Sequence, residues 1–391
     1  MTRYGKKILL IQALVCFPIF KPECLPAQTN GMEDIVLAYD SLFTASMEEE
    51  RIPGAAVVIA ADNRIVFMKA YGVRSLKTKK PVTVNTVFRL ASVSKGFAGV
   101  LACTLKEKGI LEWDKPIVSS LPDFRLSDPD HAQKITLRHL LSHSTGLLQH
   151  AYTDLLEANI PYARLVSELK TVPIGGPPGD YYGYQNVVFS LIGNVIEKET
   201  GKPYGDWLGE IIFDPLGMKH ASLGYEAMLG DTNRADPHLK DKRTQGSWFA
   251  STLSRSFYSV LPAAGVNASI SDMGQWLLAL LGNNPEFIPL QVIDEVSLPL
   301  IRTENQRKYF REWKKLGTIY YGLGWRIFHR KGLELVYHGG YVRGYRAEIA
   351  FDRENRVGIA VLMNASAQLA NVCVPRFFDI YQKQKAGLNR P

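Results

Sequence analysis

Segments with the pattern of β-strands stand near both ends of this chain, and helical segments fill the middle. Near the start, residues 55–60 and 65–71 are apolar runs joined by the polar turn Ala61-Asp62-Asn63-Arg64, which predicts a hairpin. Strands at both ends can share one core only if they meet in one sheet. The pattern therefore predicts an α+β fold, in which an antiparallel sheet built from both chain ends is flanked by helices and carries a mainly helical insertion. The strands expected near the end of the chain span residues 321–328, 333–338, 345–351 and 357–363.

The middle of the chain has apolar residues at helical spacing. No repeat divides the 391 residues, and neither does a linker rich in proline, glycine or serine. We expect one domain over residues 28–391, with its sheet part at about 33–90 and 318–391 and its helical part at about 91–317. The seam between these parts is the default place for a site. The expected helices span residues 137–141, 162–170, 187–199, 204–212, 272–281 and 369–381.

The N-terminus has the layout of an export signal. Three basic residues precede the apolar run 8–20, and prolines and small residues follow it up to Leu25-Pro26-Ala27. This layout predicts a secretory signal peptide over residues 1–27, and hence a periplasmic or secreted protein. The apolar run is short for a membrane span. A retained anchor, or a lipid on Cys16, is the alternative, although Val15 is larger than lipoprotein sites usually accept.

Charge and cysteine content exclude some classes of partner. Removal of residues 1–27 takes away four basic residues and one acidic residue, which lowers the formal net charge from +8 to +5. Because this mild excess is spread along the chain, it does not predict a nucleic-acid partner. Cys103 and Cys373 would remain, and we expect two buried free thiols rather than a disulfide. No Cys/His spacing indicates a metal site.

Ser92 and Lys95 form the first candidate for a catalytic motif. Residues three apart on a helix are surface neighbours, so a Ser-x-x-Lys spacing brings the lysine amine to the serine hydroxyl. A serine needs such a base to act as a nucleophile, and a lysine with a lowered pKa can provide it. If Ser92 lies in the first turn of a helix, its backbone N–H can face a carbonyl oxygen. Alone the motif is weak, since Ser167 and Lys170 repeat it in an ordinary amphipathic segment.

Two further segments carry polar groups at the end of a regular element. Tyr184 and Asn186 follow a turn rich in proline and glycine, just before an apolar helix. A tyrosine hydroxyl beside a lysine ammonium can ionise more easily and relay protons, and an asparagine amide can hold a substrate carbonyl. The segment His338-Gly339-Gly340-Tyr341-Val342-Arg343 ends a predicted strand with two glycines, which let a ligand approach closely. Each segment alone is more often a plain loop or turn.

The order of these three motifs, about 90 and 150 residues apart, resembles that of the penicillin-recognising serine enzymes. Because the second motif is Tyr-Gln-Asn, the resemblance is to the branch that contains class C β-lactamases, D,D-peptidases and esterases. It extends over nearly the whole chain after residue 27. The His-rich segment among the further matches looks like a structural helix and turn of the family rather than a metal site. These matches are LPDF at 121–124, HLLSHSTGL at 139–147, PAAGVN at 262–267 and YGLGW at 321–325.

The resemblance implies a mechanism through an acyl-enzyme. Ser92 would attack a carbonyl, while Lys95 and Tyr184 would share the base and acid roles. Asn186 would position the substrate amide, and the N–H groups of Ser92 and Tyr341 would stabilise the oxyanion; Gly340 would contribute to substrate binding on the same strand. Water would then release the acyl group, with no metal or organic cofactor. A Ser-His-Asp hydrolase of the α/β type is disfavoured, because the chain has no Gly-x-Ser-x-Gly segment.

The third motif departs from the Lys-Thr-Gly usual in class C β-lactamases. His338 stands where the lysine would give a fixed positive charge for a β-lactam carboxylate, and Gly339 offers no hydroxyl. With an ordinary pKa near ~6.5, His338 should gain positive charge between pH 7.5 and 5.5 and attract anionic substrates. Arg343 is the next candidate for reading a carboxylate.

Three hypotheses follow from these residues. The first is an exported serine hydrolase that acts on small amides or esters, with D-alanyl peptidoglycan peptides as the preferred natural class. The second is a class C-like β-lactamase with the same chemistry. The third is an idle receptor that binds peptidoglycan fragments or a protein partner, and the intact Ser92, Lys95 and Tyr184 argue against it. The sequence leaves the substrate and the oligomeric state open, because specificity would depend on loops such as residues 230–257.

Overall fold

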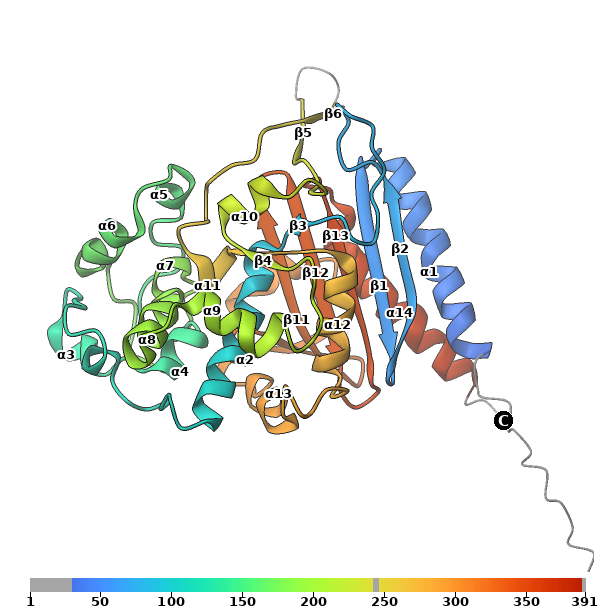
Figure 1. Ribbon diagram of the computed structural model, residues 1–391. Helices are drawn as coiled ribbons and strands as arrows, with labels where there is room; N and C mark the ends of the chain where they lie inside the picture. The colour runs from blue at the N-terminus through green and yellow to red at the C-terminus, as the bar shows by residue number, and fades with distance from the viewer. Residues whose placement is uncertain (1–29, 242–245, 389–391) are drawn as a thin grey trace, which may run out of the picture.

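The computed structural model describes residues 30–241 and 246–388 and is organised around one antiparallel sheet (Figure 1). The eight strands lie in the order β2-β1-β13-β12-β11-β10-β9-β8, so the N-terminal hairpin pairs with the last strand through β1 and β13. This arrangement confirms the α+β prediction and the sheet built from both chain ends. The strands are β1 (Gly54–Ala61), β2 (Arg64–Gly72), β8 (Ile301–Arg302), β9 (Leu316–Tyr321), β10 (Arg326–Arg330), β11 (Leu333–Val342), β12 (Tyr345–Asp352) and β13 (Val357–Met363).

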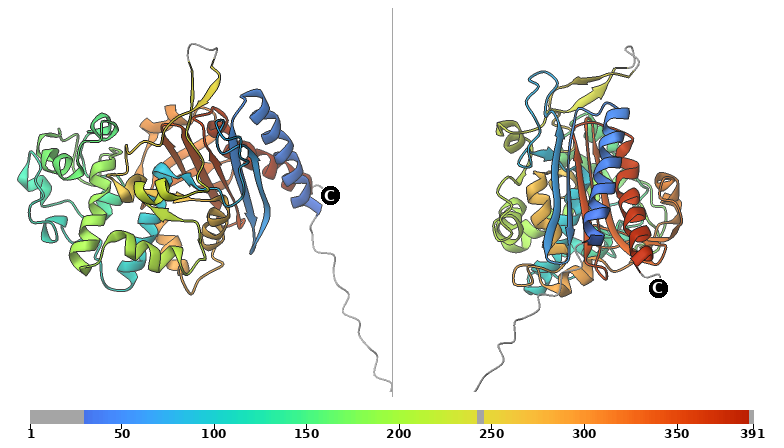
Figure 2. Two further views of the ribbon diagram at one scale, coloured as in Figure 1. Left: turned by 45° about the horizontal axis from the view of Figure 1, so that its top comes forward. Right: turned by 90° about the vertical axis from the view of Figure 1, so that its right-hand side faces the viewer.

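Helices cover both faces of this sheet. The terminal helices α1 (Asn30–Glu49) and α14 (Leu369–Leu388) lie side by side on one face (Figure 2). The side chains of β1 point alternately to the two faces of the sheet. Val57 packs in the core under α1 and α14, and Val58 packs in the core on the other side. Burial on both faces explains why β1 is an unbroken apolar run.

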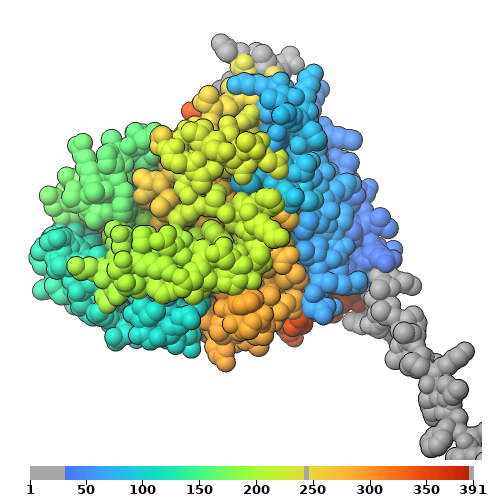
Figure 3. All heavy atoms as spheres, in the orientation of Figure 1, coloured from blue at the N-terminus to red at the C-terminus, as the bar shows by residue number. Residues whose placement is uncertain are grey.

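The helical part packs directly against the sheet part, and the two form one continuous surface (Figure 3). It also holds a small sheet of β3 (Phe88–Arg89), β7 (Val266–Ala268) and β4 (Ser222–Leu223), and a ribbon of β5 (His238–Lys240) and β6 (Trp248–Ala250). Its helices are α2 (Ser94–Glu107), α3 (Pro129–Ala132), α4 (Leu137–Leu141), α5 (Thr153–Glu157), α6 (Tyr162–Ser167), α7 (Asn186–Phe189), α8 (Leu191–Thr200), α9 (Tyr204–Leu208), α10 (Tyr225–Gly230), α11 (Leu261–Ala264), α12 (Ile270–Leu280) and α13 (Leu290–Val296).

Two strand predictions near the C-terminus need correction. Residues 321–328, expected as one strand, form the end of β9, a turn and the start of β10. The turn depends on glycine, because Gly324 has a φ of +83° and a Cβ there would lie 2.2 Å from the Lys95 carbonyl. The strand expected to end before the two glycines continues through them, since β11 runs to Val342. The sheet also includes β8, upstream of the predicted boundary at residue 318.

The predicted signal peptide, with Cys16 and the cleavage site after Ala27, lies outside the described residues. Within the residues that are described, none of the helices is long and apolar enough to cross a membrane. The remaining two cysteines agree with expectation, because Cys103 and Cys373 are both buried free thiols.

Candidate active site

The turn that carries Ser92 is held between the small sheet and α2. β3 pairs with β7, and the backbone N–H of Leu90 donates to the carbonyl of Val266. Residues Ala91–Val93 then form a single 3₁₀ turn, and α2 follows directly. Ala91 has a φ of +49°, which costs energy for a residue with a Cβ. Ser92 therefore lies on a strained turn at the N-terminal end of α2.

Lys95 reaches back from the first turn of α2 to Ser92. Its Nζ is buried and lies 3.2 Å from Ser92 Oγ, 2.8 Å from Asn186 Oδ1 and 3.0 Å from the carbonyl oxygen of Ala263. Burial, assisted by the positive charge of Arg326, lowers the pKa of Lys95 well below its ordinary value. A neutral amine has two N–H groups and one lone pair. Because the two contacting atoms, Asn186 Oδ1 and the Ala263 carbonyl oxygen, can only accept, they take the two N–H groups of the neutral amine and leave its lone pair for the Ser92 hydroxyl. This is the geometry of a general base.

Tyr184 contacts the same serine with its phenol. The Tyr184 hydroxyl donates to Ser92 Oγ over 2.9 Å, and Lys95 Nζ lies 4.8 Å from the centre of its ring. Burial raises the pKa of Tyr184, although the hydrogen bond to Ser92 and the charge of Arg326 act in the opposite direction. The expected easier ionisation of this phenol is therefore wrong for the free protein. Lys95 is the better base, and Tyr184 is the better proton donor.

The segment around Tyr184 rests on a buried histidine. Gln185 donates its backbone N–H to Nδ1 of His143 over 3.2 Å, and the His143 ring lies 4.2 Å from the Tyr184 ring. Asn186 then begins α7. His143 belongs to the segment HLLSHSTGL, which forms α4 and a following turn, as the resemblance implied. His143 therefore supports the catalytic segment by packing behind Tyr184. Across the described residues there is no group of three or more His, Cys, Asp or Glu side chains that could hold a metal ion.

Strand β11 passes against the turn that carries the serine. A Cβ on Gly340 would lie 2.1 Å from the carbonyl oxygen of Leu90 and 3.3 Å from the Ala91 side chain. The glycine is therefore needed for the close approach of the two backbones. Gly340 acts by positioning β11, and the next residue, Tyr341, lies beside the cleft with its side chain 60% exposed.

His338 does not have the environment that the sequence predicted. Its ring is buried, with Nδ1–H donating to the Gly339 carbonyl over 2.9 Å and Nε2 accepting from the Tyr321 hydroxyl over 2.9 Å. Burial lowers the pKa of His338 well below its ordinary value, and the charges of Arg326 and Lys95 lower it further. The lowered pKa disfavours the charged ring, which contradicts the expected gain of charge between pH 7.5 and 5.5.

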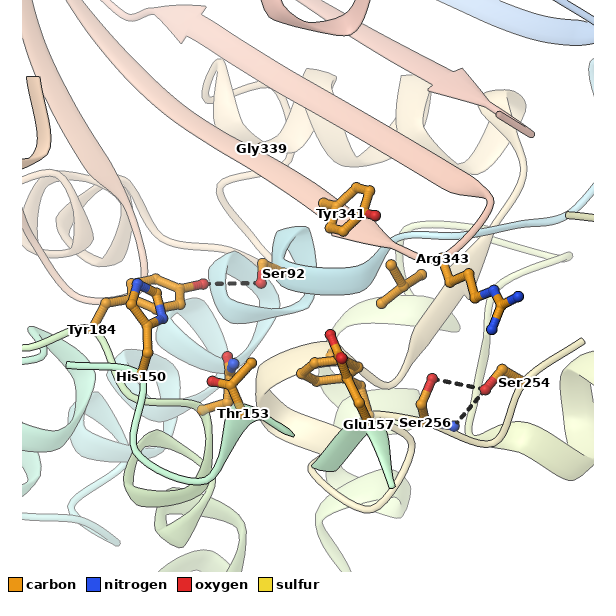
Figure 4. Close-up of a pocket in the computed structure, with 14 residues that line it drawn as sticks. Ser92, His150, Thr153, Glu157, Tyr184, Ser254, Ser256, Gly339, Tyr341 and Arg343 are labelled. Carbon is orange, nitrogen blue, oxygen red and sulfur yellow. Dashed lines mark hydrogen bonds between the residues drawn. The ribbon is translucent and has the colours of Figure 1, made fainter. Parts of the chain in front are cut away.

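A cleft of about 560 Å³ opens over Ser92 (Figure 4). Tyr184 and Asn186 line it near the serine, and Tyr341, Val342 and Arg343 line it along β11. All the predicted site residues except Lys95, His338 and Gly340 therefore contribute to its wall. Sequence reasoning missed the rest of the lining, which comes from the loop before α5, α5 itself, the segment before α11 and the end of β11. These further lining residues include His150, Thr153, Glu157, Ser254, Ser256 and Phe257.

Comparison with known proteins places this geometry in a family. Residues 39–376 match the family described as Beta-lactamase. The chain belongs to the β-lactamase family. This membership confirms the resemblance to the penicillin-recognising serine hydrolases.

The relatives that this chain matches are named for different activities. The chain is 29% identical to Esterase EstB of Burkholderia gladioli, over 46% of this chain and 49% of the esterase. It is 28% identical to a D-aminopeptidase of Cereibacter sphaeroides, over 81% of this chain and 58% of the relative. It thus spans about half to two thirds of the length of the curated relatives that it matches. The octameric penicillin-binding protein homologue from Pyrococcus abyssi has the same fold, with a TM-score of 0.79 at 23% identity over 89% of this chain and 77% of that structure.

One residue of this β-lactamase-family site, Arg326, has no counterpart in the sequence predictions. It lies on β10, with its guanidinium carbon 5.6 Å from the centre of the Tyr184 ring and 5.5 Å from that of Tyr321. Its Nη1 is cut off from solvent and has no hydrogen-bond partner, and no described carboxylate forms a salt bridge with it. Arg326 also lines a pocket of about 140 Å³ that meets the main cleft at Gly339 and Tyr341. A permanent positive charge is thus supplied by β10, where the third motif on β11 lacks a lysine.

Proposed function

We propose that this protein is an exported serine hydrolase that cleaves small amides or esters through an acyl-enzyme. Among the natural substrates, we prefer peptides with a carboxylate on the leaving group, as D-alanyl peptidoglycan peptides have. The observation that carries the proposal is the arrangement at Lys95, whose two acceptors leave a lone pair for the hydroxyl of Ser92. The proposal that the protein is exported is based on the signal-peptide layout of residues 1–27 in the sequence.

The proposed chemistry uses each group in the state that its surroundings favour. Neutral Lys95 takes the proton of Ser92 as Oγ attacks the substrate carbonyl carbon. The N–H groups of Ser92 and Tyr341 stabilise the oxyanion. As the bond to the leaving group breaks, Tyr184 donates its proton to the departing nitrogen or oxygen and is reprotonated from Lys95. Water then attacks the acyl-serine by the reverse sequence, and Ser92 regains its proton.

Arg326 supports a carboxylate on the leaving group. The leaving atom has to be within hydrogen-bond reach of Tyr184, and the guanidinium of Arg326 lies over the same tyrosine ring. A carboxylate one residue beyond the cleaved bond would meet Arg326 in the adjoining pocket, where Asn371 also contributes to the wall. The contacts of Arg326 among the described residues are to aromatic side chains and not to a carboxylate, so a substrate carboxylate would give its charge a partner of opposite sign. An ester that lacks the carboxylate gains nothing from this pocket.

The first experiment asks which compounds acylate the protein. Residues 28–391 are incubated with β-lactams, D-Ala-D-Ala peptides and aryl esters, and intact mass detects the acyl-enzyme. Acylation by peptides and esters, followed by turnover, is expected. Rapid turnover of β-lactams would instead favour the class C-like hypothesis. Absence of acylation by every compound would favour the idle receptor.

The second experiment tests the carboxylate on the leaving group. For Arg326→Met we expect kcat/KM for a D-Ala-D-Ala peptide to fall about 10- to 100-fold relative to kcat/KM for a neutral aryl ester, because a charged hydrogen-bond partner is lost. The control is Arg302→Met, a change at an exposed position on β8. In the parent protein the same ratio should be flat from pH 5.5 to 7.5, since Arg326 does not titrate there and His338 remains neutral. A ratio that rises toward pH 5.5 would contradict the assignment to Arg326.

A further inference from the structure

The outer half of the cleft carries two charges of opposite sign. Glu157 projects from α5 and Arg343 from the turn that follows β11, and both line the cavity over Ser92 (Figure 4). Both side chains are exposed, and neither forms an ion pair or hydrogen bond with another described residue. They are not paired with each other either. Charged side chains that line a cleft without partners are available to a ligand.

The position of Tyr184 decides which part of a substrate meets these charges. Its hydroxyl lies 2.9 Å from Ser92 Oγ, so the leaving group has to depart on the tyrosine side. The acyl group therefore extends away from Tyr184, along the outer end of β11. Figure 4 shows Glu157 and Arg343 in that direction from Ser92, and Tyr184 with His150 in the opposite direction.

The wall between the two charges is rigid and polar. Arg89 is buried, stacks on the Tyr258 ring at 3.8 Å, and donates to the carbonyl oxygens of Ser254 and Ser256 over 3.1 and 2.9 Å. The two serine hydroxyls are 2.8 Å apart and line the cavity. The main chain of this segment is thus fixed from behind, and because Ser254 Oγ donates to Ser256 Oγ and accepts from the Ser256 backbone N–H, the Ser256 hydroxyl keeps its own proton for a hydrogen bond to a polar acyl group.

We propose that the acyl part of the substrate ends in an amino acid that is attached through its side chain, so that both of its α groups are free: its ammonium group binds Glu157 and its carboxylate binds Arg343. The inference rests on the proposed function and narrows its substrate class. A carboxylate suits the fork of an arginine, and an ammonium group suits a single carboxylate. Both side chains are exposed, so solvent weakens each contact, and each charge contributes selectivity rather than most of the affinity.

The test uses four peptide substrates that share one scissile bond and one leaving group and differ only at the acyl end. The end is an unblocked amino acid, the same residue with an acetylated amine, the same residue with an amidated carboxylate, or the residue blocked at both groups. Residues 28–391 should give the highest kcat/KM with the unblocked end. Each block should lower kcat/KM on the order of 5-fold, the size expected of a partly solvated ion pair.

Two variants assign the effects to the two residues. Glu157→Gln should abolish the preference for a free amine and retain the preference for a free carboxylate, whereas Arg343→Gln should do the reverse. Matched controls are Glu197→Gln and Arg311→Gln, which alter exposed charges outside the cleft. Equal rates for all four substrates, or variants that change all four alike, would overturn the inference while the acyl-enzyme still forms. Failure of every substrate to form an acyl-enzyme would overturn the proposed function itself, and this inference with it.

Discussion

The inner and outer parts of the cleft are built in opposite ways. Around Ser92, the lysine amine and the tyrosine hydroxyl are buried and held by hydrogen bonds to fixed partners. Along the outer walls, Glu157 and Arg343 are exposed and keep their charges unpaired among the described residues. The buried groups gain shifted pKa values from their surroundings, and the exposed groups keep charges that a ligand can use. The contrast teaches that reaction type and substrate choice depend on different segments of this chain.

The largest effect should come from the nucleophile. Ser92→Ala should lower turnover by about 10³-fold or more and abolish covalent labelling by a β-lactam or a phosphonate, because Ser92 is the one hydroxyl among the described residues that is hydrogen-bonded to Lys95. Intact mass measures the labelling. The control is Ser167→Ala, which alters the other Ser-x-x-Lys segment on the exposed end of α6 and should leave labelling unchanged. Labelling of the Ser92→Ala protein would show that a different residue is the nucleophile.

The proton relay should give the next largest effect and should be non-additive. Lys95→Ala and Tyr184→Phe should each slow acylation by about 10²- to 10⁴-fold, and the double variant should be little worse than the worse single one. Acylation rates from single-turnover kinetics measure this. Because Lys95 has to be neutral to act, kcat/KM should rise with pH through its lowered pKa, and the acid limb should lie well below the pH range of an ordinary lysine. Fully additive losses would mean that the two groups act in separate steps.

The smallest effect concerns the contact that joins the inner site to β11. Gly340→Ala places a methyl group against the Leu90 carbonyl, so either β11 or the Ser92 turn has to move. We expect a loss of about 1–3 kcal/mol in the free energy of unfolding, together with slower acylation. Denaturant unfolding and acylation kinetics measure the two losses. Gly230→Ala is the control, because a Cβ there meets no atom within 4 Å. A Gly340→Ala protein with full activity would show that the inner site tolerates displacement of this strand.

The sequence could predict the inner site because short motifs with regular spacing determine it. Ser92 and Lys95 are three residues apart, and Tyr184 and Asn186 are two apart beside a helix start. Arg326 could not be predicted in this way, since only the strand order β11-β10-β9 brings it beside Tyr184. Because a single strand was expected over residues 321–328, the prediction did not include the turn between β9 and β10 that positions Arg326.

The remaining differences between the sequence predictions and the structure arise from the surroundings of a residue in the folded protein, which its type alone does not reveal. His338 was given an ordinary histidine pKa, but the hydrogen bonds and burial that keep it neutral are properties of the folded molecule. Glu157 lies in a helix of five residues that carries no recognisable motif. The segment from Arg307 to Lys315, RKYFREWKK, contains five basic and three aromatic residues, and the structure places its Phe310 ring 5.0 Å from the Arg326 guanidinium. The sequence analysis described the excess positive charge as spread along the chain and did not consider this local group of basic residues.

The contact of β11 with the Ser92 turn has a consequence for the order in which the parts of the active site are assembled. During synthesis the Ser92 segment leaves the ribosome early, whereas the strand that packs against its turn is among the last parts to be made. A nascent or truncated chain therefore holds the serine and lysine without the wall that completes the cleft. Contacts between distant parts of a sequence also form slowly. The cleft over Ser92 is thus incomplete until β11 has been synthesised and has folded against the Ser92 turn.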